Sequence, residues 1–132
     1  MKSLAMLFAE RVSSDRGLNT IERVMDEVVV HAPFPIHNDL WVYFEIAADE
    51  GEAGRPVHLR LELIDPEGRA HVAGEGDPIF PLSQHPEMPA VWAPKFHVAF
   101  PLARAGRHLV RLTIDDQVVA ERPLLVTQEA WL

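Results

Sequence analysis

Histidine is the residue type that most directly suggests chemistry in this sequence, because seven occur among 132 residues. His31 and His37 flank a loop that contains two prolines, and Asp39 follows two residues after the second histidine. Two imidazoles and a carboxylate are groups that a divalent transition metal accepts as ligands. Their spacing matches no established metal-site pattern, and the prolines constrain this loop for structural reasons. We therefore keep these residues as a candidate metal site, favour a structural role for them, and predict no resident cofactor.

Three further histidines differ in the face of the strand that they occupy. His58 and His97 lie on the polar faces of two predicted strands and would meet only if those strands pair. We favour exposed, solvated side chains for both. His108 instead shares a strand face with apolar residues, so we expect it to be buried with one ring nitrogen hydrogen-bonded. A buried histidine of this kind would resist protonation.

The carboxylates offer no arrangement that selects a catalytic pair. Asp115-Asp116 falls between two alternating runs, where aspartate favours a hairpin turn. The acidic run Asp49–Glu52 could offer oxygen ligands to calcium, but it lacks the spacing of a known calcium loop. A hydrolytic pair such as Glu45 with Glu62 stays open, because nothing distinguishes it among 20 carboxylates.

Nucleophiles and phosphate-binding motifs are equally uninformative. Ser83 is followed closely by His85, but neighbouring loop residues seldom form a working dyad, and no serine lies in a G-x-S-x-G motif. The sequence has no Walker loop, no G-x-G-x-x-G and no H-E-x-x-H. We assign no catalytic residue and expect a non-enzymatic protein.

Composition and charge exclude several classes of function. Twelve basic residues against 20 acidic ones give a net charge of −8, which argues against nucleic acid or an anionic membrane as the main partner. Residues 1–54 hold four basic and ten acidic side chains, a net charge of −6, so a basic partner would be steered there. There is no cysteine for a disulfide, a thiolate metal site or a nucleophile. The apolar run Leu4–Ala9 is too short for a signal peptide, and we expect a cytoplasmic protein.

The elements that must position any site are strands, because apolar residues alternate with polar ones at a period of two. Leu40–Ala48 is apolar on both faces and is predicted to be a central strand. Asn19–Val30 fits a helix or a strand, and its β-branched end favours a strand. Pro123 should lie where its strand has an edge or a bulge. The remaining predicted strands are Ser3–Val12, Pro56–Asp65, Lys95–Phe100, Gly106–Asp115 and Gln117–Val126.

The segment Gly76–Pro94 breaks this alternation and contains five of the 11 prolines. We predict a long irregular crossover between two sheets, and loops of this length inside a domain are often functional. Its aromatic residues Phe80 and Trp92, together with Trp131 near the chain end, are our candidates for contact with a protein partner. We favour the interpretation that such rings, Phe34 included, plug the open ends of the fold, and an exposed patch for a partner is the other possibility. Trp41 and Tyr43 are expected in the core.

Two resemblances add to this interpretation. The segment 105–126, AGRHLVRLTIDDQVVAERPLLV, resembles the last two strands of many immunoglobulin-like domains, with His108 where those domains often have tyrosine. The whole chain is similar to a bacterial family of single-domain proteins of about this length and of unknown function. The residues that carry this similarity are Leu7–Val12, Leu63–Gly68 and Val119–Leu124. The resemblance implies a β-sandwich and transfers no catalytic residue.

We therefore predict an all-β, immunoglobulin-like β-sandwich of seven to nine mostly antiparallel strands, with residues 1–132 forming one domain. The predicted function is protein binding or assembly through an exposed strand edge or the proline-rich loop, with a homodimer formed by the same route. One alternative is a small-ligand or metal-binding sandwich that uses the loop histidines. Another is an enzyme whose carboxylate or histidine site the sequence does not locate.

Overall fold

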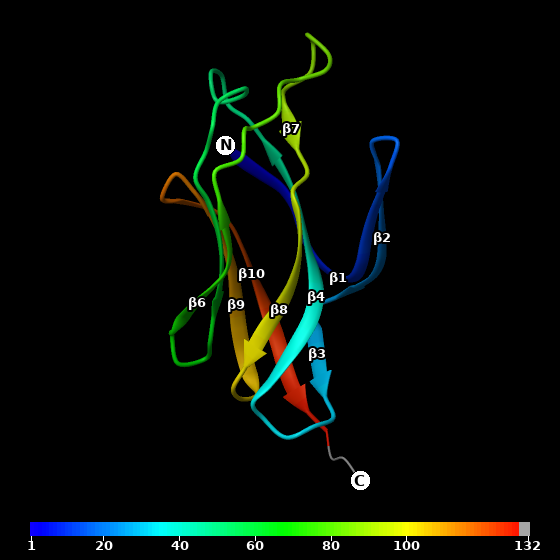
Figure 1. The fold of residues 1–132 in the computed structure, drawn as a ribbon, viewed down its shortest axis with the longest axis vertical. Coiled ribbons are helices and arrows are strands. Elements are labelled where there is room, and N and C mark those ends of the chain that lie inside the picture. The colour runs from blue at the N-terminus through cyan, green and yellow to red at the C-terminus, as the bar shows by residue number, and fades with distance from the viewer. Residues whose placement is uncertain (130–132) are drawn as a thin grey trace.

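The computed structural model describes residues 1–129 and contains two five-stranded sheets (Figure 1). In the first sheet, β4 (Ile36–Ala47) pairs with β1 (Lys2–Asp15) on one side, and β1 pairs with β2 (Leu18–Met25). On its other side β4 pairs with both β7 (Val91–Trp92) and β8 (Lys95–Leu102). The second sheet has the order β3 (Glu27–Val30), β10 (Gln117–Gln128), β9 (Gly106–Ile114), β5 (Leu59–Ile64) and β6 (Ala70–Gly76). Among residues 1–129, no helix has the length and apolar character needed to span a membrane.

The all-β prediction is confirmed, although the described residues form ten strands rather than seven to nine. The two-residue β7 and the four-residue β3 raise the number, and both lie in segments where the sequence shows no clean alternation. All strand pairs are antiparallel except β3 with β10, which is parallel.

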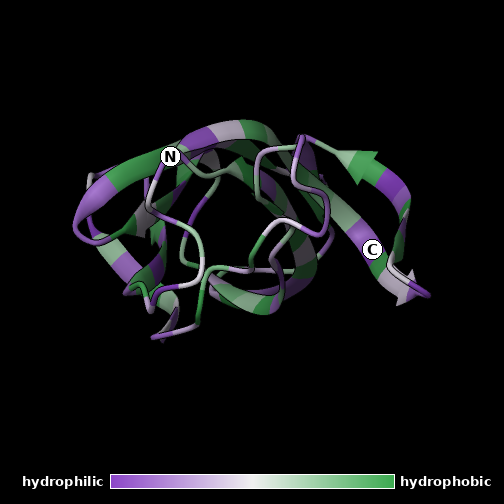
Figure 2. Cartoon of the chain, turned by 90° about the horizontal axis from the view of Figure 1, so that it is seen from above, coloured by the Kyte–Doolittle hydropathy of each residue, from purple (hydrophilic) through white to green (hydrophobic). Residues whose placement is uncertain are grey.

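The core lies between the sheets because alternate side chains of each strand point inward. In β5, Leu59, Leu61 and Leu63 are buried, and the residues between them are half-buried. The largest fully buried side chains are four phenylalanines, of which Phe8, Phe44 and Phe100 come from the first sheet and Phe80 from the crossover. Seen from above, the strands surround this core, and the hairpin of β1 and β2 stands to one side (Figure 2).

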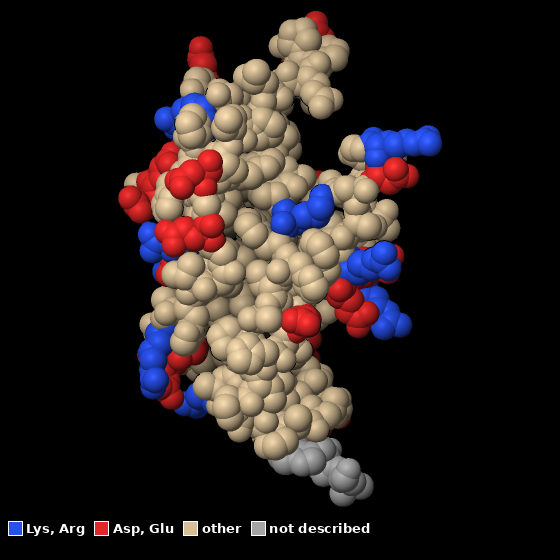
Figure 3. Space-filling model, viewed as in Figure 1, with Lys and Arg blue, Asp and Glu red and all other residues tan. Residues whose placement is uncertain are grey.

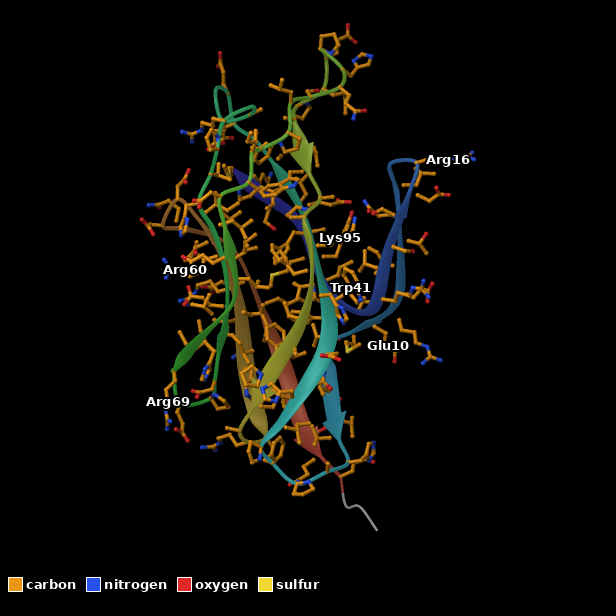
Figure 4. The ribbon with its side chains drawn as sticks, viewed as in Figure 1. Glu10, Arg16, Trp41, Arg60, Arg69 and Lys95 are labelled. Atoms are coloured by element: carbon orange, nitrogen blue, oxygen red, sulfur yellow. The ribbon has the colours of Figure 1, made fainter. Side chains whose placement is uncertain are left out.

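That hairpin continues beyond the sheet as an arm, residues 11–22, that covers part of the outer face of the first sheet. Val12 and Ile21 of the arm pack with Tyr43 and Trp41 of β4, forming a second, smaller apolar cluster. Lys95 contacts the arm through Asn19, with its Nζ 3.4 Å from the Asn19 Oδ1. Figure 4 shows Trp41 and Lys95 near the arm, and Arg16 at its tip. The arm explains why β4 is apolar on both faces.

The segment Asn19–Val30 is extended, as favoured from its sequence, but it divides into two strands that belong to different sheets. β2 ends at Met25 and β3 begins at Glu27. The intervening Asp26 uses its carbonyl to accept a hydrogen bond from the backbone N–H of Leu125, at 3.0 Å. The chain therefore crosses from one sheet to the other at Asp26, and the helical alternative is wrong.

Several local predictions are confirmed in the second sheet. Asp115 and Asp116 have φ values of 51° and 63°, so they form the turn of a two-residue hairpin between β9 and β10. Pro123 pairs with β9 on one side, while β3 pairs with β10 only from Leu125 onward. His108 is buried, with its Nδ1 3.1 Å from the carbonyl oxygen of Gly106.

Candidate functional site

The proline-rich crossover between β6 and β8, residues 77–94, is the candidate site, and we call it the end loop. It leaves the second sheet after Gly76 and joins the first sheet at β7, as predicted, and it is irregular apart from β7. Its first part runs along residues 54–57. The Val57 N–H donates to the Pro78 carbonyl at 2.9 Å, and the Phe80 N–H donates to the Arg55 carbonyl at 3.0 Å. These bonds fix the base of the loop on the sandwich.

The tip of the end loop is held by one serine. The Ser83 Oγ lies 2.7 Å from the carbonyl oxygens of both His85 and Met88, and it accepts a hydrogen bond from the His85 N–H at 3.2 Å. The Met88 N–H also donates to the His85 carbonyl at 3.1 Å. The imidazole of His85 faces the Glu87 N–H at 3.3 Å. Ser83 and His85 therefore close a turn through the backbone and do not form a nucleophile–base pair.

Large apolar side chains are exposed along this loop. Leu82 is 72% exposed, Ile79 65% and Met88 62%. Val91 is exposed too, whereas Trp92 is half-buried. No strand alternation marks these residues in the sequence, and our sequence interpretation followed the aromatic residues instead. One sequence feature could have identified them. They are apolar residues in a proline-rich segment, where no strand alternation directs their side chains into the core.

Phe80 requires a correction, because its ring is fully buried and no partner can reach it on the folded surface. It meets Trp92 edge to face, with ring centroids 5.5 Å apart, and so supports the end loop from below. Phe34 also packs against the core, from a half-buried position. Both rings pack on the core at the ends of the sandwich, as the favoured interpretation held. Trp131 lies outside the described residues.

Two open depressions flank the end loop. One has a volume of about 490 Å³ and lies between Leu82 and Pro89 of the loop and residues 48–53. The other, about 440 Å³, is enclosed by the loop itself, from Pro81 to Ala93, with Trp92 in its wall. Leu82 and Pro89 line both depressions. This end of the molecule therefore has a depression with apolar walls on each side of the braced end loop.

The charges around this end are acidic. Asp77 at its base and Glu87 at its tip are the charged side chains of the loop, and residues 48–54 contribute Asp49, Glu50 and Glu52. Figure 3 shows red side chains at the tips of the two protruding loops. The α-amino group of Met1 lies 2.7 Å from the Asp49 Oδ2 and 2.8 Å from the Glu52 Oε1. These two carboxylates therefore hold an ammonium group.

The predicted metal ligands do not come together. Within residues 1–129, no three histidine or carboxylate side chains are close enough to hold one metal ion. His37 and Asp39 lie on β4 with exposed side chains, whereas His31 follows β3 and lies 3.7 Å from a Glu129 carboxylate oxygen. The small-ligand and metal alternative loses its proposed site.

The other candidate histidines have separate surroundings. His58 precedes β5 in the second sheet and lies between two carboxylates, with Asp77 2.9 Å from its Nδ1 and Glu75 2.8 Å from its Nε2. Asp77 and, after it, Glu75 raise the pKa of His58 above its usual range, because both favour the charged imidazolium. His97, on β8, stacks on Trp41 with ring centroids 4.8 Å apart. Trp41 is half-buried, so its core assignment is only partly correct.

The carboxylates Glu45 and Glu62 lie on strands of different sheets, β4 and β5, which do not pair. Glu45 instead accepts a hydrogen bond of 2.6 Å from the hydroxyl of Tyr43. Burial, assisted by this hydrogen bond, raises the pKa of Tyr43 to about 12. A hydrolytic Glu45–Glu62 pair has no support in this geometry.

The free sheet edges are the second predicted route to a partner. β2 is the outermost strand of the first sheet, and its regular ladder is interrupted at Arg23, which has a φ of 56°. Arg23 also forms an ion pair of 3.1 Å with Glu10 across the hairpin. An interrupted ladder and edge charges are features that disfavour addition of another strand. The end loop is therefore a better candidate surface than the β2 edge.

A family model described as "Family of unknown function (DUF6941)" matches residues 4–127 of the chain. No curated protein matches it. An immunoglobulin-like protein from Pseudomonas aeruginosa is similar, with 15% identity and a TM-score of 0.42 over 92% of this chain and 91% of that one. The DNA glycosylase AlkC of Pseudomonas fluorescens, bound to DNA containing an abasic site analog, gives 8% identity and a TM-score of 0.48. That similarity covers 77% of this chain and 28% of the glycosylase chain.

Proposed function

The chain belongs to DUF6941, a family of unknown function, and we propose that it is a non-enzymatic protein-binding module that uses the end loop as its contact surface. The observation that carries this proposal is the concentration of exposed apolar side chains on one braced loop. Of the eleven large exposed hydrophobic residues in the described part of the chain, four fall within residues 79–91. Single exposed apolar residues are ordinary, whereas a cluster of them is typical of an interaction site.

The bracing of the loop supports the same function. Binding costs free energy when a flexible segment must be ordered, and a segment held in its bound shape avoids part of this cost. Ser83 fixes the tip, backbone hydrogen bonds fix the base, and Phe80 fills the space beneath. Leu82 and Met88 are therefore presented to solvent by a loop that these other contacts hold in place. Neither side chain belongs to the hydrophobic core, so packing inside the molecule does not account for their apolar character.

The proposal is tested by capturing proteins from the source organism's lysate with matched variants as bait. Leu82→Asp places a charge in the surface without touching the core. Leu18→Asp makes the same change at the arm tip, where Leu18 is 74% exposed, and Val72→Asp makes it on β6. We expect a specific partner that is retained by wild type and by the Leu18 and Val72 variants, and is lost with Leu82→Asp.

Two results would reject the end loop as the contact surface. Retention of every captured protein by Leu82→Asp would show that the loop does not bind. Loss with Leu18→Asp alone would transfer the contact to the arm and its strand edge. Capture of no protein, with a small molecule found on the native protein by mass spectrometry, would favour the ligand-binding alternative.

The predicted homodimer stays a prediction, because only one copy of the chain is present. Light scattering over a hundredfold range of protein concentration measures it directly. A dimer made through the strand edge should dissociate in the Leu18→Asp variant, and a monomer at every concentration would remove the prediction.

A further inference from the structure

We propose that the end loop recognises a short basic segment of a partner protein, with one apolar side chain flanked by lysine or arginine, and that this segment lies in the groove between the loop and residues 48–53. The inference rests on the proposed function and adds to it the chemical class of the partner. Its evidence is the shape of the groove, the rigidity of its floor and the sign of the charges along its rim.

The groove is apolar at its centre. Leu82, Pro89 and Ala90 line it from the end loop, and Ala48 and Ala53 line it from the other side. Its volume of about 490 Å³ is more than enough for the side chain of one leucine or methionine together with a short stretch of extended backbone. An apolar side chain placed there would leave water on contact with these walls.

The floor of the groove is fixed by hydrogen bonds between its two walls. The Ala48 N–H donates to the Ala90 carbonyl at 2.9 Å, and the Gly54 N–H donates to the Phe80 carbonyl at 2.7 Å. The Leu82 side chain packs against Gly54 and so bridges the two walls above this floor. The contact is close, since a Cβ added at Gly54 would lie only 2.8 Å from the Leu82 Cδ2. The groove is thus present before any partner binds.

The rim of the groove selects the charge of the partner. Glu50 lines one wall of the groove, and Glu87 lies at the tip of the loop, two residues before Pro89 of the other wall; both side chains are exposed. Within residues 1–129, neither carboxylate forms an ion pair. Residues 48–54 and 77–94 contain five carboxylates and no lysine or arginine. Lysine or arginine side chains of a partner could pair with these two carboxylates. A basic segment is therefore attracted to the groove and an acidic one is repelled.

The inference is tested by titrating ¹⁵N-labelled protein with three acetylated nonapeptides and following the backbone amides by NMR. The probes are GKRGLGKRG, its acidic counterpart GEDGLGEDG, and GKRGSGKRG, which lacks the apolar side chain. We expect the first peptide to shift amides of residues 48–54 and 81–93 with a dissociation constant at least tenfold lower than the other two. Its affinity should also fall as salt is raised, because the contact is charge-assisted.

Matched variants separate the rim charges from net charge. Glu50→Lys with Glu87→Lys reverses two charges at the groove, and Asp15→Lys with Glu22→Lys reverses two on the arm. We expect the first pair to weaken binding of GKRGLGKRG at least tenfold and the second pair to weaken it less than threefold. Equal losses in both pairs, shifts confined to other surfaces, or no preference for the basic peptide would overturn the inference.

The outcomes also distinguish this inference from the proposed function. If Leu82→Asp abolishes capture of a partner while the Glu50 and Glu87 reversals leave capture unchanged, the function stands and the basic class of partner is wrong. If Leu82→Asp has no effect on capture, the function fails. A second copy is the other occupant to consider, because Arg16 and Leu18 protrude at the arm tip. Self-association that disappears on reversing Glu50 and Glu87 would assign the groove to that copy and overturn the inference.

Discussion

Replacing Phe80 by alanine tests whether this ring supports the end loop from the core rather than meeting a partner. The side chain is fully buried and lies edge to face against Trp92, at 5.5 Å between ring centroids. Removing a buried phenylalanine ring costs about 3–5 kcal/mol, because the transfer free energy is lost and a cavity remains. For a domain of this size about 1 kcal/mol lowers the Tm by roughly 3–4 °C. We therefore expect the Tm of Phe80→Ala to fall by about 10–20 °C.

The assay is thermal and urea unfolding followed by circular dichroism, with two comparison variants. Phe80→Leu keeps most of the apolar volume and should lose less than half as much stability as Phe80→Ala. Leu82→Asp, at a 72% exposed side chain, should change the free energy of unfolding by at most about 0.5 kcal/mol. If Phe80→Ala lowers the free energy of unfolding by less than about 1 kcal/mol, the core role of Phe80 is refuted, because removal of a fully buried ring costs more than that.

Three further predictions follow from named contacts. Because neighbouring carboxylates raise the pKa of His58, its ion pairs stabilise the fold fully below the unfolded value of about 6.5 and are lost as pH rises through the folded pKa. The Tm difference between wild type and His58→Asn should therefore be larger at pH 5.5 than at pH 9, and a pH-independent difference would contradict this. Tyr43 is the single tyrosine, so absorbance at 295 nm should show its hydroxyl ionising near pH 12. The free energy of unfolding should fall as pH rises from about 10 to 12, because the unfolded tyrosine ionises first. A midpoint near pH 10 in folded protein would reject its burial. Gly54→Ala should destabilise the fold by about 1 kcal/mol or more, because its φ is +81° and the added methyl would displace Leu82. If the substitution shifts only the NMR signals of position 54, then Leu82 does not pack there.

The regular strands were predictable because their alternation is a local property of the sequence. β5, β8, β9 and β10 begin within a few residues of their predicted ranges, and His108 is buried as its strand phase indicated. The turn at Asp115-Asp116 was also predictable, since both residues adopt positive φ in the hairpin. Period and turn chemistry therefore identify elements without any knowledge of their neighbours.

The arrangement of elements was less accessible, because it depends on contacts between distant residues. Nothing local in Asn19–Val30 indicates that the chain changes sheets at Asp26. The burial of Tyr43 on an outer sheet face depends on the arm, whose Val12 and Ile21 pack against it.

The candidate site shows the same limit. Phe80 and Leu82 are both apolar residues of one irregular segment, yet Phe80 is fully buried and Leu82 is 72% exposed. In a strand, two residues of the same parity share a face, but the end loop has no such rule. The backbone hydrogen bonds of Phe80 with residues 54 and 55 hold the chain in the position where its ring points inward.

Site-specific photo-crosslinking from position 82 tests the central claim most directly. A photoreactive phenylalanine analogue would replace Leu82 in the full chain, expressed in the source organism, with position 72 on β6 and position 18 on the arm as controls. We predict an ultraviolet-dependent crosslink to a partner protein from position 82 and none to that partner from position 72. Crosslinks from position 18 alone, or an absence of any crosslink from position 82 in protein that is folded, would contradict binding through the end loop.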